Sequence, residues 1–133
     1  MVKLMRKKFS KTWVRSTQPR KQRKYRYNAP LHKKQKMMSI HLDKALRKEY
    51  KKRSIPARRG DEIIVMRGKL RKKKGKISRV DMKSLKIYVE NIKKKKSSAQ
   101  EVEMPIDPSN LMITKLNMED RKRKKALLRK EKK

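Results

Sequence analysis

The sequence has 133 residues, of which 46 are Lys or Arg and 12 are Asp or Glu, so its formal net charge is +34. Hydrophobic residues make up only 34%, there is no Cys, and no apolar run approaches the ~18 residues of a membrane-spanning helix. This composition allows one small domain, excludes disulfides and cysteine-based zinc sites, and predicts a soluble intracellular polycation.

The excess of positive charge predicts a polyanionic partner. Because like charges repel, such a chain stays compact only when they are neutralised, and RNA or DNA is the leading candidate. The alternative, an anionic membrane surface, requires an amphipathic helix with a broad apolar face, which the sequence lacks. The first eight residues also lack the apolar stretch of a signal peptide. We therefore expect a nucleic-acid partner and no membrane.

Residues 1–38 are predicted to be an extended basic arm. Apolar residues are sparse there and follow neither a helical nor a strand period, and Pro19 and Pro30 interrupt regular elements. Aromatic residues are interleaved with the cations, a pattern that offers both base stacking and phosphate contacts. We expect the arm to become ordered along an RNA, and an ordinary disordered tail is the alternative.

Residues 39–59 are predicted to be a short helix and a linker. Ser39 is the expected N-cap of a helix over residues 39–52. Its apolar stripe is expected to pack on the core, while its cations face phosphate. Pro56 ends the helix, because proline cannot donate a backbone hydrogen bond and holds the preceding residue extended.

Residues 60–116 are predicted to be mainly β, in a small barrel. Short runs of alternating or continuous apolar residues follow one another with no helical pattern between them. The runs are 63–66, 76–81, 85–89, 102–106 and 111–113. We expect a turn over residues 81–84 and a solvated loop over residues 93–98. Pro105 makes its run an edge strand.

Residues 117–133 are predicted to be a basic C-terminal helix or tail. Asn117 is the expected N-cap, and the acidic residues that follow suit the positive end of a helix dipole. The segment has too few apolar residues to be a buried helix. We expect it to lie on RNA and to fray without it.

The strongest local pattern is a charged loop between two predicted strands. Gly68 permits a turn with positive φ, and five of the next six residues are cations before Gly75 begins the next strand. A preorganised loop loses less entropy when it binds phosphate. A solvated charged hairpin is the alternative interpretation.

Catalysis has little support in this sequence. His32 and His41 are its two histidines and lack a metal-ligand spacing. Glu101 and Glu103 lie beside a lysine run and balance its charge, and Asp61 is expected to form local hydrogen bonds. Glycine-rich nucleotide loops are absent. We therefore expect no enzymatic activity, no cofactor and no metal.

Two sets of residues resemble a known family. The first resembles the KOW motif of small SH3-like barrels and consists of Gly60, Asp61, Val65, Gly68, Gly75 and Ile77. The second resembles the large-subunit ribosomal protein family counted twenty-fourth in bacteria and twenty-sixth in eukaryotes, in its archaeal–eukaryotic form. Its segments are 28–32, 38–39, 46–50, 53–56 and 108–111. Two positions depart from the family: Lys72 stands where the KOW motif has glycine, and Asp107 where many relatives have histidine.

The resemblance implies a structural, RNA-binding protein of the large ribosomal subunit. It would bind the 5′ region of the large-subunit rRNA near the polypeptide exit tunnel, contact neighbouring ribosomal proteins and support subunit assembly. It would reside in cytoplasmic ribosomes, with assembly in the nucleolus in a eukaryote; contact with nascent-chain targeting factors stays open. The alternatives are a KOW-type transcription-elongation or nucleolar RNA-binding factor and a DNA-compacting chromatin protein.

The expected RNA-binding residues are aromatic and basic side chains spread over the whole chain. They are Trp13, Arg20, Lys21, Arg23, Lys24, Tyr25, Arg26, Tyr27, His32, Lys33, Lys34, Arg47, Arg53, Arg58, Arg59, Arg67, Lys69, Arg71, Lys72, Lys73, Lys74, Lys76, Arg121 and Arg123. Their phosphate contacts would position the protein, whereas stacked or splayed bases on the aromatic residues would supply specificity.

Overall fold

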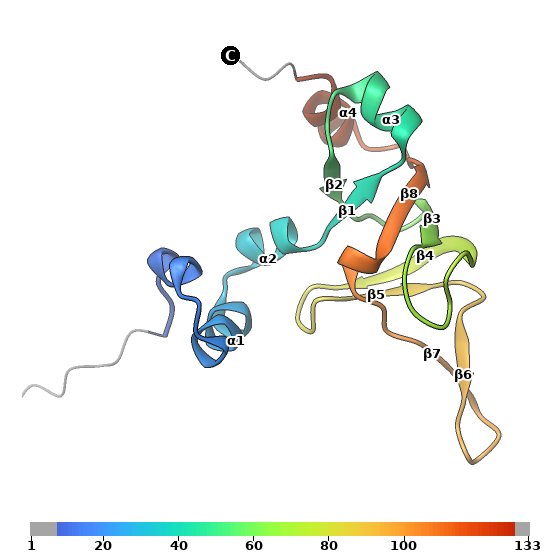
Figure 1. Ribbon diagram of the computed structural model, residues 1–133. Helices are drawn as coiled ribbons and strands as arrows, with labels where there is room; N and C mark the ends of the chain where they lie inside the picture. Colours follow the sequence, from blue (N-terminus) through green and yellow to red (C-terminus); the bar gives the residue numbers. More distant parts are fainter. Residues whose placement is uncertain (1–7, 130–133) are drawn as a thin grey trace, which may run out of the picture.

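The computed structural model describes residues 8–129, and a curved β sheet occupies its centre (Figure 1). Six strands follow the order β2-β1-β8-β3-β4-β5. They are β1 (Ser39–Leu42), β2 (Ser54–Pro56), β3 (Glu62–Val65), β4 (Lys74–Asp81), β5 (Lys86–Val89) and β8 (Leu111–Lys115). Strands β6 (Lys93–Lys95) and β7 (Glu101–Glu103) form a separate hairpin that projects away from the other strands.

A backbone bridge joins strand β5, at one edge of the sheet, to the segment that leads into β8. Strand β3 pairs antiparallel with β4 and β8, and β4 pairs antiparallel with β5. Ile87 of β5 and Ile106 exchange two backbone hydrogen bonds of 2.9 Å. The chain then passes through the 3-10 helix η2 (Pro108–Asn110) into β8. The small β barrel predicted from the alternating residues is therefore confirmed.

Aliphatic side chains fill the barrel because the strands alternate between its inside and its outside. Most of the buried apolar residues form one cluster, to which β1 and the C-terminal helix also contribute. Its members are Met38, Ile40, Leu42, Ile55, Ile63, Val65, Ile77, Ile87, Val89, Ile92, Ile106, Leu111, Ile113 and Leu127. Burying each such side chain stabilises the fold by about 1.5–3 kcal/mol before entropy is counted.

Strand β1 occupies the start of the predicted helix. Ile40 and Leu42 are fully buried and alternate with half-buried neighbours, which is the period of a strand. β1 pairs in parallel with β8 and antiparallel with β2. Helix α3 (Lys44–Tyr50) begins only after Asp43, whose carboxylate accepts a 2.7 Å hydrogen bond from the next backbone amide. The N-cap is thus Asp43, and the prediction of Ser39 was wrong.

The N-terminal segment is helical where an extended arm was predicted. It contains the 3-10 helix η1 (Lys11–Arg15) and the helices α1 (Pro19–Asn28) and α2 (Leu31–Met37). Pro19 is the first residue of α1, and Pro30 is the N-cap of α2. Proline is favoured at the start of a helix because its missing N–H has no partner there. Residues 1–7 of the predicted arm lie outside the described residues.

The C-terminal helix α4 (Arg121–Leu128) packs on the barrel. Asp120 is its N-cap and accepts a 2.9 Å hydrogen bond from the backbone amide of Lys122, so the prediction of Asn117 was wrong. Leu127 is 2% exposed and belongs to the core, which contradicts the expectation of an unburied helix. Residues 130–133 of the predicted helix lie outside the described residues. Between residues 8 and 129, no helix has the length and apolarity needed to cross a membrane.

Two connections of the barrel differ in how well they were predicted. The turn over residues 81–84 is confirmed: Asp81 accepts hydrogen bonds from the amides of Lys83 and Ser84, at 2.9 and 3.3 Å. The solvated loop over residues 93–98 was wrong for its first three residues, which form β6 and pair with β7, whereas all six residues are exposed as predicted. β7 spans only the first part of the edge strand expected over residues 102–106.

Candidate nucleic-acid interface

The charged loop between β3 and β4 is held rigidly on the barrel. The backbone amide of Lys72 donates to the carbonyl of Val65 at 2.8 Å, and the amide of Val65 donates to the carbonyl of Lys73 at 3.0 Å. Met66 donates a further 2.7 Å hydrogen bond to Asn110, next to β8. Leu70 packs partly buried against the core. The loop therefore presents its exposed cations from a fixed base, as predicted. These are Arg67, Lys69, Arg71, Lys72, Lys73 and Lys74.

Backbone conformations in and beside this loop explain its departure from the KOW motif. Gly68 has φ +89°, as a glycine turn requires. Lys72, which replaces a glycine of the motif, has φ +70° and so keeps the left-handed turn. That conformation costs a non-glycine residue about 1–2 kcal/mol. At Gly75, an added Cβ would lie 2.6 Å from Cγ1 of Val89. Close strand packing accounts for glycine there.

Three aromatic residues of the N-terminal segment stack on one another. The rings of Phe9 and Tyr25 are stacked with centroids 5.2 Å apart, and Phe9 meets Trp13 edge-on at 6.5 Å. The Lys24 ammonium lies 5.0 Å from the Trp13 ring centroid, within cation–π range. This cluster joins η1 to α1. Tyr25 is only 7% exposed, so its predicted role as a stacking surface for bases was wrong, whereas Tyr27 is 80% exposed.

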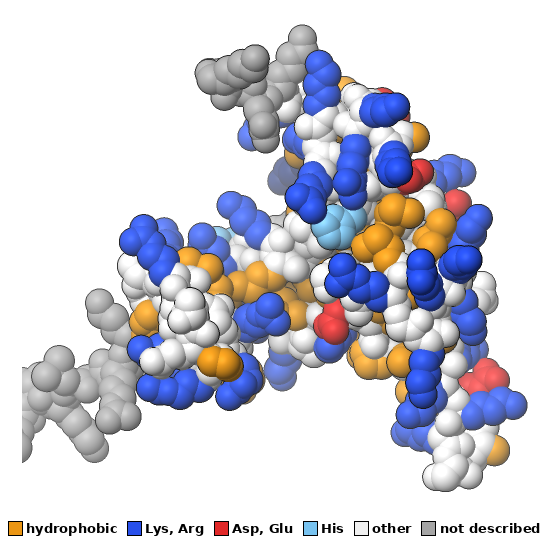
Figure 2. Space-filling view, in the orientation of Figure 1, with side chains coloured by type: hydrophobic (Ala, Val, Ile, Leu, Met, Phe, Trp, Pro, Cys, Tyr) orange, Lys and Arg blue, Asp and Glu red, His pale blue; other side chains and the backbone are white. Residues whose placement is uncertain are grey.

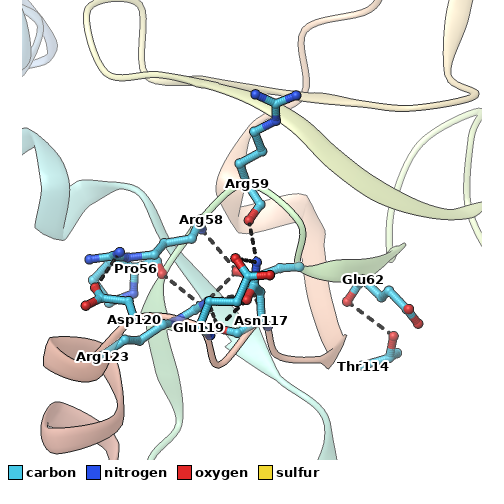
Figure 3. Close-up of polar contacts among 10 residues, drawn as sticks. Pro56, Arg58, Arg59, Glu62, Thr114, Asn117, Glu119, Asp120 and Arg123 are labelled. Atoms are coloured by element: carbon cyan, nitrogen blue, oxygen red, sulfur yellow. Dashed lines mark hydrogen bonds and ion pairs between the residues drawn. The ribbon is translucent and has the colours of Figure 1, made fainter.

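Arg123 is 4% exposed, and its polar contacts are drawn in Figure 3. Its guanidinium donates to both carboxylate oxygens of Asp61, at 2.6 and 2.7 Å, and the two side chains are 3% and 0% exposed. Asp61 also accepts from the amides of Arg58 at 3.0 Å and Asn117 at 2.9 Å. The expected RNA contact of Arg123 was therefore wrong. This pair anchors α4 to the start of the barrel.

Other predicted residues also contact protein. Lys34 is 7% exposed, and its ammonium donates to the carbonyl of Lys83 at 3.4 Å, so its prediction as a surface phosphate contact was wrong. The half-buried Arg47 donates from Nε to the carbonyl of Leu42 at 2.6 Å. Arg58 is exposed and forms an ion pair with Asp120. These contacts orient α2, α3 and α4 on the barrel.

Most of the predicted residues do lie at the surface. Figure 2 shows basic side chains distributed over the visible face, with few acidic ones among them. Trp13, Lys33 and Arg47 are half-buried. The exposed residues are Arg20, Lys21, Arg23, Lys24, Arg26, Tyr27, His32, Arg53, Arg58, Arg59, Arg67, Lys69, Arg71, Lys72, Lys73, Lys74, Lys76 and Arg121. They come from α1, α2, the segments on either side of β2, the loop between β3 and β4, the start of β4, and α4, so the structure offers an extended cationic surface instead of one compact patch.

Sequence reasoning missed cations that the fold brings near this surface. Lys36 of α2, Lys83 of the β4–β5 turn and Lys86 at the start of β5 line one groove with residues of α1. They are far apart in the sequence, and only the topology joins them. Within residues 8–129, no three His, Asp or Glu side chains are placed to hold a metal ion.

Comparison with known proteins identifies the family. A family model described as ribosomal proteins L26 of eukaryotes and L24 of archaea matches residues 16–130. The chain is 43% identical over 115 residues to the large ribosomal subunit protein uL24 of Methanosphaera stadtmanae, covering 86% of this chain and 98% of that protein. It is 46% identical over 117 residues to uL24 of Korarchaeum cryptofilum, covering 88% and 89%. The chain therefore belongs to the ribosomal protein family of eukaryotic L26 and archaeal L24.

Proposed function

We propose that the protein is a structural component of the large ribosomal subunit that binds the 5′ region of the large-subunit rRNA near the polypeptide exit tunnel. Membership of a ribosomal protein family over residues 16–130 is the observation that carries the proposal. The two archaeal relatives are named as proteins of the large subunit. Neighbouring ribosomal proteins would be its further partners, in cytoplasmic ribosomes, and its binding would support subunit assembly.

Neutralisation of phosphates supplies the mechanism. A net charge of +34 and an extended surface of exposed cations suit the closely spaced phosphates of folded RNA. The barrel fixes the loop between β3 and β4, and the ion pair of Asp61 with Arg123 fixes α4. Cations on such a rigid scaffold lose little entropy when they meet phosphates. The protein would in this way hold RNA segments together that otherwise repel.

Sucrose-gradient sedimentation of cell extracts at moderate and high salt tests the proposal. We expect the protein to sediment with the large subunit in stoichiometric amount and to stay there at moderate salt. A transcription-elongation or nucleolar factor would sediment with polymerase or in free nuclear complexes, and a chromatin protein would follow DNA. Sedimentation away from large subunits would overturn the proposal. Crosslinking of the purified subunit, followed by mapping of the crosslinked nucleotides, tests the 5′ position separately.

A further inference from the structure

An open groove of about 1050 Å³ separates the N-terminal helices from the barrel. Residues of α1 and α2 form one wall, and the β4–β5 turn and η2 form the other. Hydrophobic side chains are visible where the helices meet the barrel in Figure 2. The volume is that of a site able to take a small molecule or a few units of a polymer.

The groove carries a strong excess of positive charge. Six cations line it: Arg23, Arg26, Lys33, Lys36, Lys83 and Lys86. They face two carboxylates, which leaves a net charge of +4, six minus two. Both carboxylates already have partners, since Asp81 accepts from Ser84 at 2.7 Å and Asp107 lies 2.6 Å from the Lys86 ammonium. The remaining cations are available to an anion.

Apolar surface accompanies these charges. Val14, Met37, Leu85 and Pro108 line the groove, and so does Tyr27, which is 80% exposed. An exposed tyrosine in a cationic groove is the arrangement with which proteins stack single-stranded bases. The other aromatic residues of the segment, Phe9, Trp13 and Tyr25, are occupied with one another. Tyr27 is thus the ring that remains for a ligand.

We propose that this groove binds an unpaired nucleotide of RNA, with the base stacked on Tyr27 and the flanking phosphates on the surrounding cations. The inference rests on the proposed function and names the kind of RNA element that this part of the protein recognises. A paired A-form helix keeps its bases stacked inside and presents ribose, phosphate and base edges, but no open base face on which Tyr27 could stack. An acidic peptide supplies the charge but no flat ring face for Tyr27. An unpaired nucleotide supplies both.

Binding of the full-length protein to two matched hairpin RNAs tests the inference. One hairpin is fully paired, and the other carries a bulge of unpaired adenines with 2-aminopurine as a fluorescent base. We expect tighter binding of the bulged hairpin and quenching of the 2-aminopurine on binding. Tyr27→Ala should weaken binding of the bulged hairpin by roughly 5- to 150-fold, the usual range for a lost base–aromatic stack, and leave the paired hairpin unchanged.

Two variants control for changes in folding. Tyr27→Phe keeps the ring and should bind the bulged hairpin as the parent protein does. Leu31→Ala removes another exposed apolar side chain, 65% exposed on α2 and outside the groove, and should change neither affinity. Equal losses for both hairpins after Tyr27→Ala, or no loss at all, would overturn the inference. The paired hairpin reports phosphate binding, and the sucrose gradient reports association with the large subunit. A negative result for the bulged hairpin would therefore overturn this inference and leave the proposed function intact.

Discussion

The barrel and the N-terminal helices are stabilised in different ways. Thirteen of the fourteen residues in the core cluster lie between residues 38 and 113, within or beside the strands. In the N-terminal helices, the buried apolar residues are Tyr25 in α1 and Ala29 just after it. Residues 1–37 nevertheless carry 14 cations and no carboxylate. The barrel holds itself together by apolar burial, whereas the helices combine little burial with much repulsion, so we expect them to need a polyanion to stay in place.

Helix α4 shows that a basic composition does not by itself decide whether a segment is held by the core or depends on a polyanion. It is as basic as α1, with Arg121, Lys122, Arg123, Lys124 and Lys125 in its first five positions. Yet Arg123 pairs with the buried carboxylate of Asp61, and the side chain of Leu127 packs in the core. Two inward side chains are enough to attach α4 to the barrel.

Asp61→Ala should have the largest effect, because it would detach α4 from the barrel. Removing one partner of a buried, hydrogen-bonded ion pair leaves the other charge uncompensated and costs about 3–5 kcal/mol. The variant also leaves the amides of Arg58 and Asn117 without their acceptor. We expect the free energy of unfolding, measured by urea denaturation, to fall by about that amount.

Arg121→Ala on the same helix is the matched control. Arg121 is exposed, so its loss should change the free energy of unfolding by no more than about 0.5 kcal/mol. Replacing Asp61 and Arg123 together by apolar residues of similar size should recover most of the loss, because no charge then remains buried. A loss with Asp61→Ala as small as that of the control would show that the pair does not anchor α4.

Deleting residues 1–37 should separate stability from RNA binding. Met38 is kept because it is 1% exposed and its carbonyl accepts a 3.1 Å hydrogen bond from Ala57. We expect the truncated protein to unfold cooperatively on heating. If the segment makes about five phosphate contacts, its loss should lower affinity for a large-subunit rRNA fragment roughly a thousandfold at ~0.15 M salt.

A second variant distinguishes the charge of this segment from its shape. Lys21, Arg23, Lys24 and Arg26 are exposed cations of α1, and all four can be replaced by Gln in the full-length chain. We expect this variant to lose a large part of the same affinity. Undiminished RNA binding by the Gln variant would show that the segment does not contribute through its charge. Non-cooperative melting of the truncated protein would show that the barrel depends on residues 1–37 for its stability.

The barrel was predictable from sequence because burial leaves a local pattern. Leu85, Ile87 and Val89 alternate with Lys86, Tyr88 and Glu90. The same period marks Ile40 and Leu42, but an apolar stripe farther along suggested a helix, and two capping residues four positions apart, Ser39 and Asp43, were both available. Helix boundaries are poorly determined when caps compete in this way.

The helices of the N-terminal segment and the anchor of α4 left no such pattern. Helix α1 is rich in Arg and Lys, which favour helices without producing an apolar stripe. Asp61 and Arg123 are 62 residues apart, so the sequence around either residue does not indicate its partner. The exposed cations of the charged loop were predictable because five cations among six successive residues need no distant partner. Selecting which basic residues turn inward required the three-dimensional fold.

Replacing Lys72, Lys73 and Lys74 together by Ala tests the barrel's own share of RNA binding. The three side chains are exposed on the fixed loop, so we expect the log–log salt slope of rRNA binding to decrease by about 2–3. The same replacement of Lys93, Lys94 and Lys95 in β6 removes equal charge from the projecting hairpin and serves as control. Equal effects would show that total charge matters and that the rigidity of the loop does not.

The smallest effect should come from Asp81, in the barrel turn that faces the N-terminal helices. Hydrogen bonds from the hydroxyl and amide of Ser84 and the amide of Lys83 hold the pKa of Asp81 below its ordinary value. A carboxylate with a lowered pKa in the folded state stabilises the fold above its unfolded pKa, about 3.9, and this contribution disappears as pH falls through the lower, folded value. Asp81→Asn should therefore lower the urea midpoint slightly at pH 7 and differ less from the parent in acid. Glu90→Gln, which changes an exposed carboxylate just after β5, is the control. If the urea midpoints of Asp81→Asn and the parent protein differ by the same amount at pH 7 and in acid, the carboxylate does not stabilise the turn.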